Sequence, residues 1–188
     1  MVGALVAAVV VTALALHFHQ PFPPDGTPEG AYARVAKAIA EQRERDVFPY
    51  LEQDAQDAAF SIRDMRRAAC DAIDKSYPAG AERDALLAEY GPDATTKDGP
   101  DEFLLLASRH HFLARLRADL SGIANVERSG ERATITTAHG TRYSFRRRPN
   151  GMWGLTLFTA EMLADSERAA RDLAGVKAAA ADYARAGR

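Results

Sequence analysis

Hydrophobic and polar residues alternate with a period of two between Gly122 and Phe158, which is the spacing of a half-buried β-strand. Three dipeptides that suit tight turns divide this stretch, and they are Ser129-Gly130, His139-Gly140 and Asn150-Gly151. Between the turns, the positions that share one face are mostly apolar: Ala133, Ile135 and Thr137, then Tyr143 and Phe145, then Trp153, Leu155 and Leu157. The pattern predicts four strands in an antiparallel meander, with one face covered by helices.

The rest of the chain after residue 26 has the 3.6-residue period of amphipathic helices. Thr27 suits an N-cap and Pro28 the first helical position, so a helix is expected to begin there. Further helices are predicted over residues 51–77, 81–90, 100–120 and 160–186. Gly91 and Pro92 are expected to end the helix over 81–90, which leaves a polar loop over 91–100. This order predicts an α+β fold: N-terminal helices, then a four-stranded antiparallel meander, then a long C-terminal helix.

The chain begins with an uninterrupted apolar run, VGALVAAVVVTALAL, over residues 2–16. A helix needs about 20 apolar residues to cross a bilayer, and the flanking residues bring the run close to that length. We therefore predict an N-terminal membrane helix within residues 1–20. Its lipid-facing residues would be Val2, Leu5, Val9, Val10, Leu14 and Leu16. Two alternatives stay open: a cleavable signal peptide, for which Ala13-Leu14-Ala15 suits the cleavage site, and a buried core helix.

A proline-rich linker, PFPPDG, follows over residues 21–26, and its prolines make it stiff. The expected organisation is a membrane anchor or signal segment over 1–20, this linker, and a single α+β domain over 27–188. Asp25 and Glu29 are the first charged residues after the apolar run. Because basic residues favour the cytoplasmic side, we expect the domain on the non-cytoplasmic side of the membrane, or secreted if the segment is cleaved.

Composition narrows the function classes. The net charge is −2 and basic and acidic residues are interleaved, which argues against nucleic acid as a partner. Cys70 is the only cysteine, so no internal disulfide is expected. The sequence has no phosphate-binding loop, no nucleophile elbow, no paired CxxC and no HExxH. No cofactor, metal site or catalytic residue is predicted.

Two segments, residues 27–55 and 131–156, carry a resemblance to the nuclear-transport-factor-like superfamily, which includes polyketide-cyclase-like and ketosteroid-isomerase-like proteins. The second segment resembles the strand-turn-strand ending of that family. The resemblance implies a cone-shaped α+β domain with a pocket against the concave face of the sheet, in a member attached to the cell envelope. The helices over 52–90 and after Phe158 are longer than the simple domain requires, and they could fill or cap the cone.

Four residues are candidates for lining such a pocket. Tyr32, Tyr143 and Trp153 fall at positions that face the cone, although aromatic residues at such positions also serve as plain core. Strand alternation puts Arg147 on the face of Tyr143, where its guanidinium could hold an anion. The alternative for Arg147 is a solvated strand end within the run Arg146-Arg147-Arg148.

His110 is the fifth candidate. Adjacent helical residues point about 100° apart, so His110 and His111 cannot easily share one metal ion. His110 falls on the apolar side of the helix predicted over 100–120, which favours a buried, hydrogen-bonded histidine.

The sequence thus favours a non-catalytic, membrane-tethered binding or accessory domain of the cell envelope that contacts a protein partner or a small ligand. One alternative is a cone-pocket enzyme of the isomerase, cyclase or dehydratase type. Another is a helical scaffold that forms oligomers through residues 160–186, although the small residues of that helix favour packing within the domain.

Overall fold

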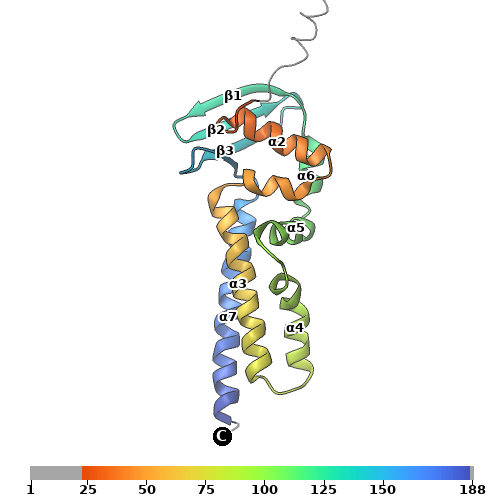
Figure 1. Cartoon of the computed structure of the whole chain (residues 1–188), viewed down its shortest axis with the longest axis vertical. Coiled ribbons are helices and arrows are strands. Elements are labelled where there is room, and N and C mark those ends of the chain that lie inside the picture. Colours follow the sequence, from red (N-terminus) through yellow and green to blue (C-terminus); the bar gives the residue numbers. More distant parts are fainter. Residues whose placement is uncertain (1–22, 187–188) are drawn as a thin grey trace, which may run out of the picture.

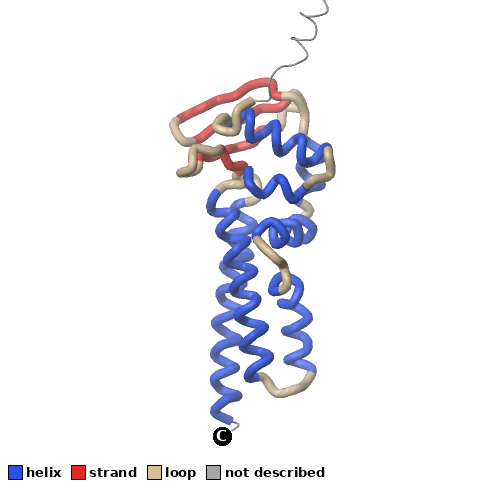
Figure 2. Tube along the Cα trace, in the orientation of Figure 1, coloured by secondary structure: helices blue, strands red, loops and turns tan. Residues whose placement is uncertain are grey.

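The structure is a computed structural model that describes residues 23–186, and it confirms the α+β class with a four-stranded antiparallel sheet and a long C-terminal helix. The elements in chain order are α2 (Pro28–Ala40), η1 (Glu44–Tyr50), α3 (Gln53–Ser76), α4 (Ala81–Ala94), α5 (Gly99–Arg109), α6 (Phe112–Asp119), β1 (Ile123–Ser129), β2 (Arg132–Thr137), β3 (Arg142–Arg147), β4 (Trp153–Leu155) and α7 (Thr159–Ala186). Figures 1 and 2 show an elongated molecule. We call the sheet with α2, η1 and α6 the head, and α3, α4 and α7 the stalk; α5 lies between them.

The sheet has the predicted order β1-β2-β3-β4. Its register pairs Ile135 with Tyr143 and Phe145 with Leu155, so the apolar positions form one buried face. Helix α2 lies in front of the sheet in Figure 1 and contributes Tyr32 to the same core. The opposite face, rich in hydroxyl and charged side chains, is left to solvent.

The predicted start of α2 is confirmed. The Thr27 hydroxyl accepts a hydrogen bond from the Gly30 amide at 3.1 Å, and Pro28 occupies the first turn. A Cβ at Gly30 would lie 2.0 Å from the Pro24 carbonyl oxygen, so only glycine allows the linker to pack against the helix here.

The stalk is a second, smaller hydrophobic cluster built around α3. Helix α3 has α7 beside it along one side and α4 along another, and Figure 1 shows the three running roughly parallel. The buried residues of this cluster are Ala69, Ile73, Tyr77, Tyr90, Val176 and Ala180. The apolar positions of α7 therefore pack within the domain, as the sequence favoured.

Two predicted helix boundaries are wrong. Helix α4 continues through Gly91 and Pro92 to Ala94, so the predicted loop over 91–100 shrinks to residues 95–98. Proline disfavours a helical residue before it partly through a clash with that residue's Cβ, and Gly91 has none. The helix predicted over 100–120 is divided into α5 and α6, because His111 adopts a left-handed conformation with φ 57°.

Within residues 23–186, no helix is long and apolar enough to cross a membrane. The predicted membrane segment, with its residues Val2 to Leu16, lies outside the described residues.

Candidate functional site at the junction of head and stalk

Three of the predicted pocket residues are brought together in the core of the head. Tyr32 and Tyr143 are buried, with ring centroids 5.6 Å apart, and Trp153 is buried near them. The Tyr32 hydroxyl donates to the Ser121 carbonyl at 2.6 Å, and the Trp153 indole donates to the Gly26 carbonyl at 3.2 Å. Burial raises the pKa of Tyr143 to about 12. Their positions match the plain-core alternative that the sequence left open.

The Arg147 side chain, unlike these aromatic residues, is not buried in the core. The register pairs it with Trp153, as the alternation predicted. Its side chain is nevertheless 49% exposed and its guanidinium lies 3.8 Å from Glu131. Arg147 is the last residue of β3, and it lines a shallow surface pocket with Arg146 and Arg148 outside the aromatic core.

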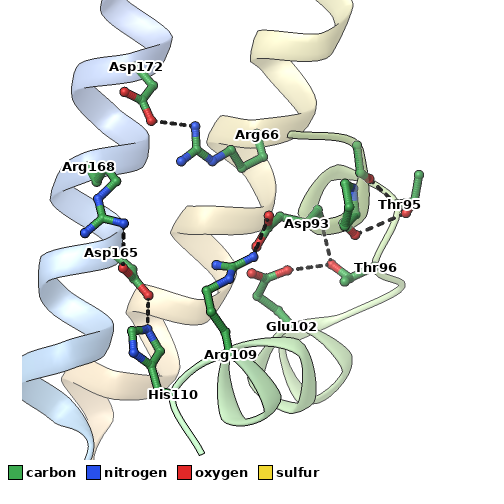
Figure 3. A network of polar contacts seen from close by, with 12 residues as sticks. Arg66, Asp93, Thr95, Thr96, Glu102, Arg109, His110, Asp165, Arg168 and Asp172 are labelled. Carbon is green, nitrogen blue, oxygen red and sulfur yellow. Dashed lines mark hydrogen bonds and ion pairs between the residues drawn. The ribbon is translucent and has the colours of Figure 1, made fainter. Parts of the chain in front are cut away.

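His110 was predicted to be a buried, hydrogen-bonded histidine; it is hydrogen-bonded, but its side chain is only partly buried. It is the residue that ends α5, because the helix breaks at His111. Its Nε2 lies 2.5 Å from Oδ2 of Asp165 on α7, and its ring stacks on Phe112. Arg168, one turn further along α7, lies 3.7 Å from the other oxygen of Asp165. His110 therefore joins the end of α5 to the stalk, as Figure 3 shows.

Two buried acids form the centre of this junction, and the sequence did not single out either. Glu102 on α5 is fully buried and Asp93 on α4 is 3% exposed. Oε2 of Glu102 accepts a hydrogen bond from the Thr96 hydroxyl at 2.9 Å, whereas its Oε1 is buried with no hydrogen-bond partner among residues 23–186. Both carboxylate oxygens of Asp93 accept from Arg109, at 3.0 and 3.1 Å (Figure 3).

Protonation of Glu102 removes the charge repulsion between these two neighbouring acids. Burial and, to a lesser extent, the neighbouring Asp93 raise the pKa of Glu102 from 4.5 to about 8. The Thr96 hydroxyl and the Arg109 charge oppose the rise. At neutral pH, Glu102 is therefore mostly neutral, and the Arg109 guanidinium lies 3.0 Å from the Asp93 carboxylate.

Arginines of α3 complete the junction. Arg66 is buried, with Nη1 2.7 Å from Asp172 of α7 and its guanidinium 4.2 Å above the Tyr90 ring centroid. Arg67 donates to the carbonyls of Ala94 and Thr96, at 3.2 and 3.1 Å. Charged residues of both signs alternate along this part of α3, a pattern typical of a solvated helix face, yet Arg66 is buried. The carboxylate that compensates it lies 106 residues away in the chain, which no local pattern can indicate.

These ion pairs and hydrogen bonds hold the helices of the junction together. Two neighbouring acids resemble an acid–base catalyst, but both are closed to solvent, and Asp93 of α4 is held by Arg109 of α5. No group of three or more His, Cys, Asp or Glu side chains suited to a metal ion occurs within residues 23–186. The junction links α3, α4, α5 and α7, so it fixes the direction of the stalk relative to the head.

The chain matches no family model, no curated protein and no solved structure.

Proposed function

We propose that this protein is a non-catalytic, membrane-tethered binding or accessory protein of the cell envelope. The head stays near the membrane and the stalk extends away from it toward a protein partner. One observation carries this proposal: the described chain starts at the head, and α7 ends at the opposite tip of the molecule (Figure 1). With 28 residues, α7 is about 42 Å long, so it reaches well beyond the head.

The length of the linker supports the same arrangement. If residues 2–16 lie in the membrane, six residues separate them from Pro23, the first described residue of the head. Six extended residues span at most about 20 Å, so the head cannot leave the membrane surface by much more than that. The stalk is then the part that reaches furthest from the membrane.

The buried junction supports a presenting role. Polar groups from four helices are paired across it, and the buried pairs Asp93–Arg109 and Arg66–Asp172 tie α4 to α5 and α3 to α7. A stalk held in one direction lowers the entropic cost of binding, because the contact surface is ordered in advance. The cone-pocket enzyme has weaker support, because the aromatic residues that would line its pocket are packed against one another.

The tether is tested with full-length protein. The double substitution Val9→Asp and Val10→Asp places two charges in the apolar run, each opposing insertion by roughly 2.5–3.5 kcal/mol. We expect wild type to remain in the membrane pellet after carbonate washing and the double variant to move to the supernatant. Ser129→Asp in the β1–β2 turn is the control and should stay in the pellet. Wild-type protein in the supernatant would overturn the tether.

The partner is tested with a photo-crosslinking amino acid at Ala181, an exposed position near the tip of α7. We expect one discrete crosslinked species on intact cells that disappears when the nearby exposed Lys177 is changed to Glu. Arg142→Glu, in the head, should leave it unchanged. A crosslink that is insensitive to Lys177→Glu, or equally sensitive to Arg142→Glu, would count against recognition through the stalk.

A further inference from the structure

A groove of about 380 Å³ lies on the solvent-facing side of the sheet, over strands β2 and β3. Its polar lining comes from Arg132, Thr134, Ser144, Arg146 and Thr156. This volume is within the range of small-molecule sites, roughly 300–1,000 Å³. We call it the sheet-face groove. It is separate from the junction and plays no part in the proposed tether or stalk.

The strand register places two positive charges directly opposite each other in this groove. Arg132 pairs with Arg146 across β2 and β3, and Thr134 pairs with Ser144 one step further along the same face. Like charges at directly opposed positions destabilise a sheet. Within residues 23–186, the Arg132 side chain makes no hydrogen bond or ion pair, so no carboxylate in that range is paired with its charge. A bound anion would relieve this repulsion.

Arg146 is held in place from behind. Its Nη1 lies 2.5 Å from Oε1 of Glu52 and 3.4 Å from Asp54. Glu52 is itself buried, and its other oxygen accepts a hydrogen bond from the Thr159 hydroxyl at 2.7 Å. A buried carboxylate therefore orients Arg146 through one nitrogen. Nε and Nη2 of Arg146 have no hydrogen bond in the described part of the chain and remain available to a ligand.

Two hydroxyl donors complete the set. The Thr134 and Ser144 side chains make no hydrogen bonds within residues 23–186, and the register puts them beside the two guanidiniums. The third hydroxyl, of Thr156, is already bound to the Ser144 carbonyl at 3.2 Å. The two guanidiniums and the two neutral hydroxyls can all donate hydrogen bonds to a ligand. Such a set of donors suits a tetrahedral oxyanion, whose oxygens accept hydrogen bonds.

We propose that the sheet-face groove binds the phosphate group of a phosphorylated small molecule. Arg132 supplies the uncompensated charge, Arg146 supplies an oriented guanidinium, and Thr134 and Ser144 donate to the remaining phosphate oxygens. The groove is larger than a phosphate ion alone, so the rest of the molecule extends along the sheet. Such a phosphate has two sources, a soluble phosphate ester or the headgroup of a phosphomonoester lipid.

The test uses full-length protein in phosphatidylcholine nanodiscs, titrated with phenyl phosphate at constant ionic strength and followed by calorimetry. Losing one charge-assisted pair should weaken binding about tenfold or more in Arg132→Gln. Arg142→Gln is the matched control: Arg142 lies on the same face of β3, paired with Glu127 outside the groove, and its loss should change the Kd less than about twofold. No binding by wild type, or equal weakening in both variants, would overturn the proposal.

A second arm separates the two sources. Nanodiscs that contain phosphatidic acid should block phenyl phosphate in the wild type if the headgroup occupies the groove. If the ligand is a soluble ester, the titration should be the same in both kinds of disc. Either result keeps the site, provided that the Arg132→Gln dependence is present.

Discussion

Glu102 should make the stability of this protein fall as the pH rises. Its pKa is about 8 in the folded protein and 4.5 as an ordinary carboxyl group. Between these values the folded state holds a proton that the unfolded state has released. The free energy of unfolding therefore decreases by about 1.4 kcal/mol per pH unit. The stabilisation is fully present below pH 4.5 and is lost as the pH rises through 8.

The variant Glu102→Gln removes this titration while keeping the size of the side chain and an oxygen for the Thr96 hydroxyl. Across three pH units the wild type should lose at most about 4 kcal/mol through Glu102. The variant should lose far less. Urea unfolding at about pH 5, 6, 7 and 8 measures the difference between the two slopes.

Glu167→Gln provides the control, since Glu167 is exposed on α7 and its removal should leave the wild-type slope intact. Parallel pH profiles for wild type and Glu102→Gln would refute the reasoning. Glu102 would then be ionised when folded, and the burial argument would be wrong.

Three further predictions concern packing and pairing, each measured as the free energy of unfolding. Tyr143→Phe should be neutral or stabilising, because its buried hydroxyl has no partner in the described part of the chain. Tyr32→Phe should cost about 1 kcal/mol, because its hydroxyl is hydrogen-bonded; a larger loss for Tyr143→Phe would contradict this. Gly99→Ala should cost about 1–3 kcal/mol, since its Cβ would lie 2.7 Å from a phenylalanine ring. Gly122→Ala is the control, because its Cβ meets open space and should cause no such loss of stability; equal effects would argue against the close approach. Arg66→Met should cost about 1–3 kcal/mol, because the Asp172 carboxylate loses its partner in a buried ion pair; no measurable cost would exclude the ion pair as a stabilising contact.

Local patterns were sufficient for the sheet and for most helices. Alternation between Gly122 and Phe158 specifies which side chains share a face, and the Gly-containing turns specify where each strand ends. Both signals depend on residues that are close together in the chain, so they can be recognised from the sequence alone. The cap at Thr27 belongs to the same class, since its hydrogen bond spans three residues.

Tertiary contacts accompany both of the helix boundaries that the sequence predicted wrongly. His110 fits an uninterrupted apolar stripe, yet the helix breaks at His111. The His110 ring contacts Asp165, 55 residues away in the chain. Helix α4 continues past Gly91, and Asp93 in its last turn is then held by Arg109. At His111 a contact between distant segments outweighs the local preference. At Gly91 the missing Cβ allows the helix to continue, and the contact with Arg109 then holds its last turn.

The candidate sites follow the same division. The sequence identified Tyr32, Tyr143 and Trp153 as residues that face the sheet's covered side, and they do. It could not indicate Glu102, whose burial depends on how α4 and α5 meet, nor the opposed pair of Arg132 and Arg146, which depends on strand register. Periodicity determines which face a side chain takes. What it meets there depends on the packing of segments that lie far apart in the chain, because the free energy of a buried charge is set by its neighbours in space.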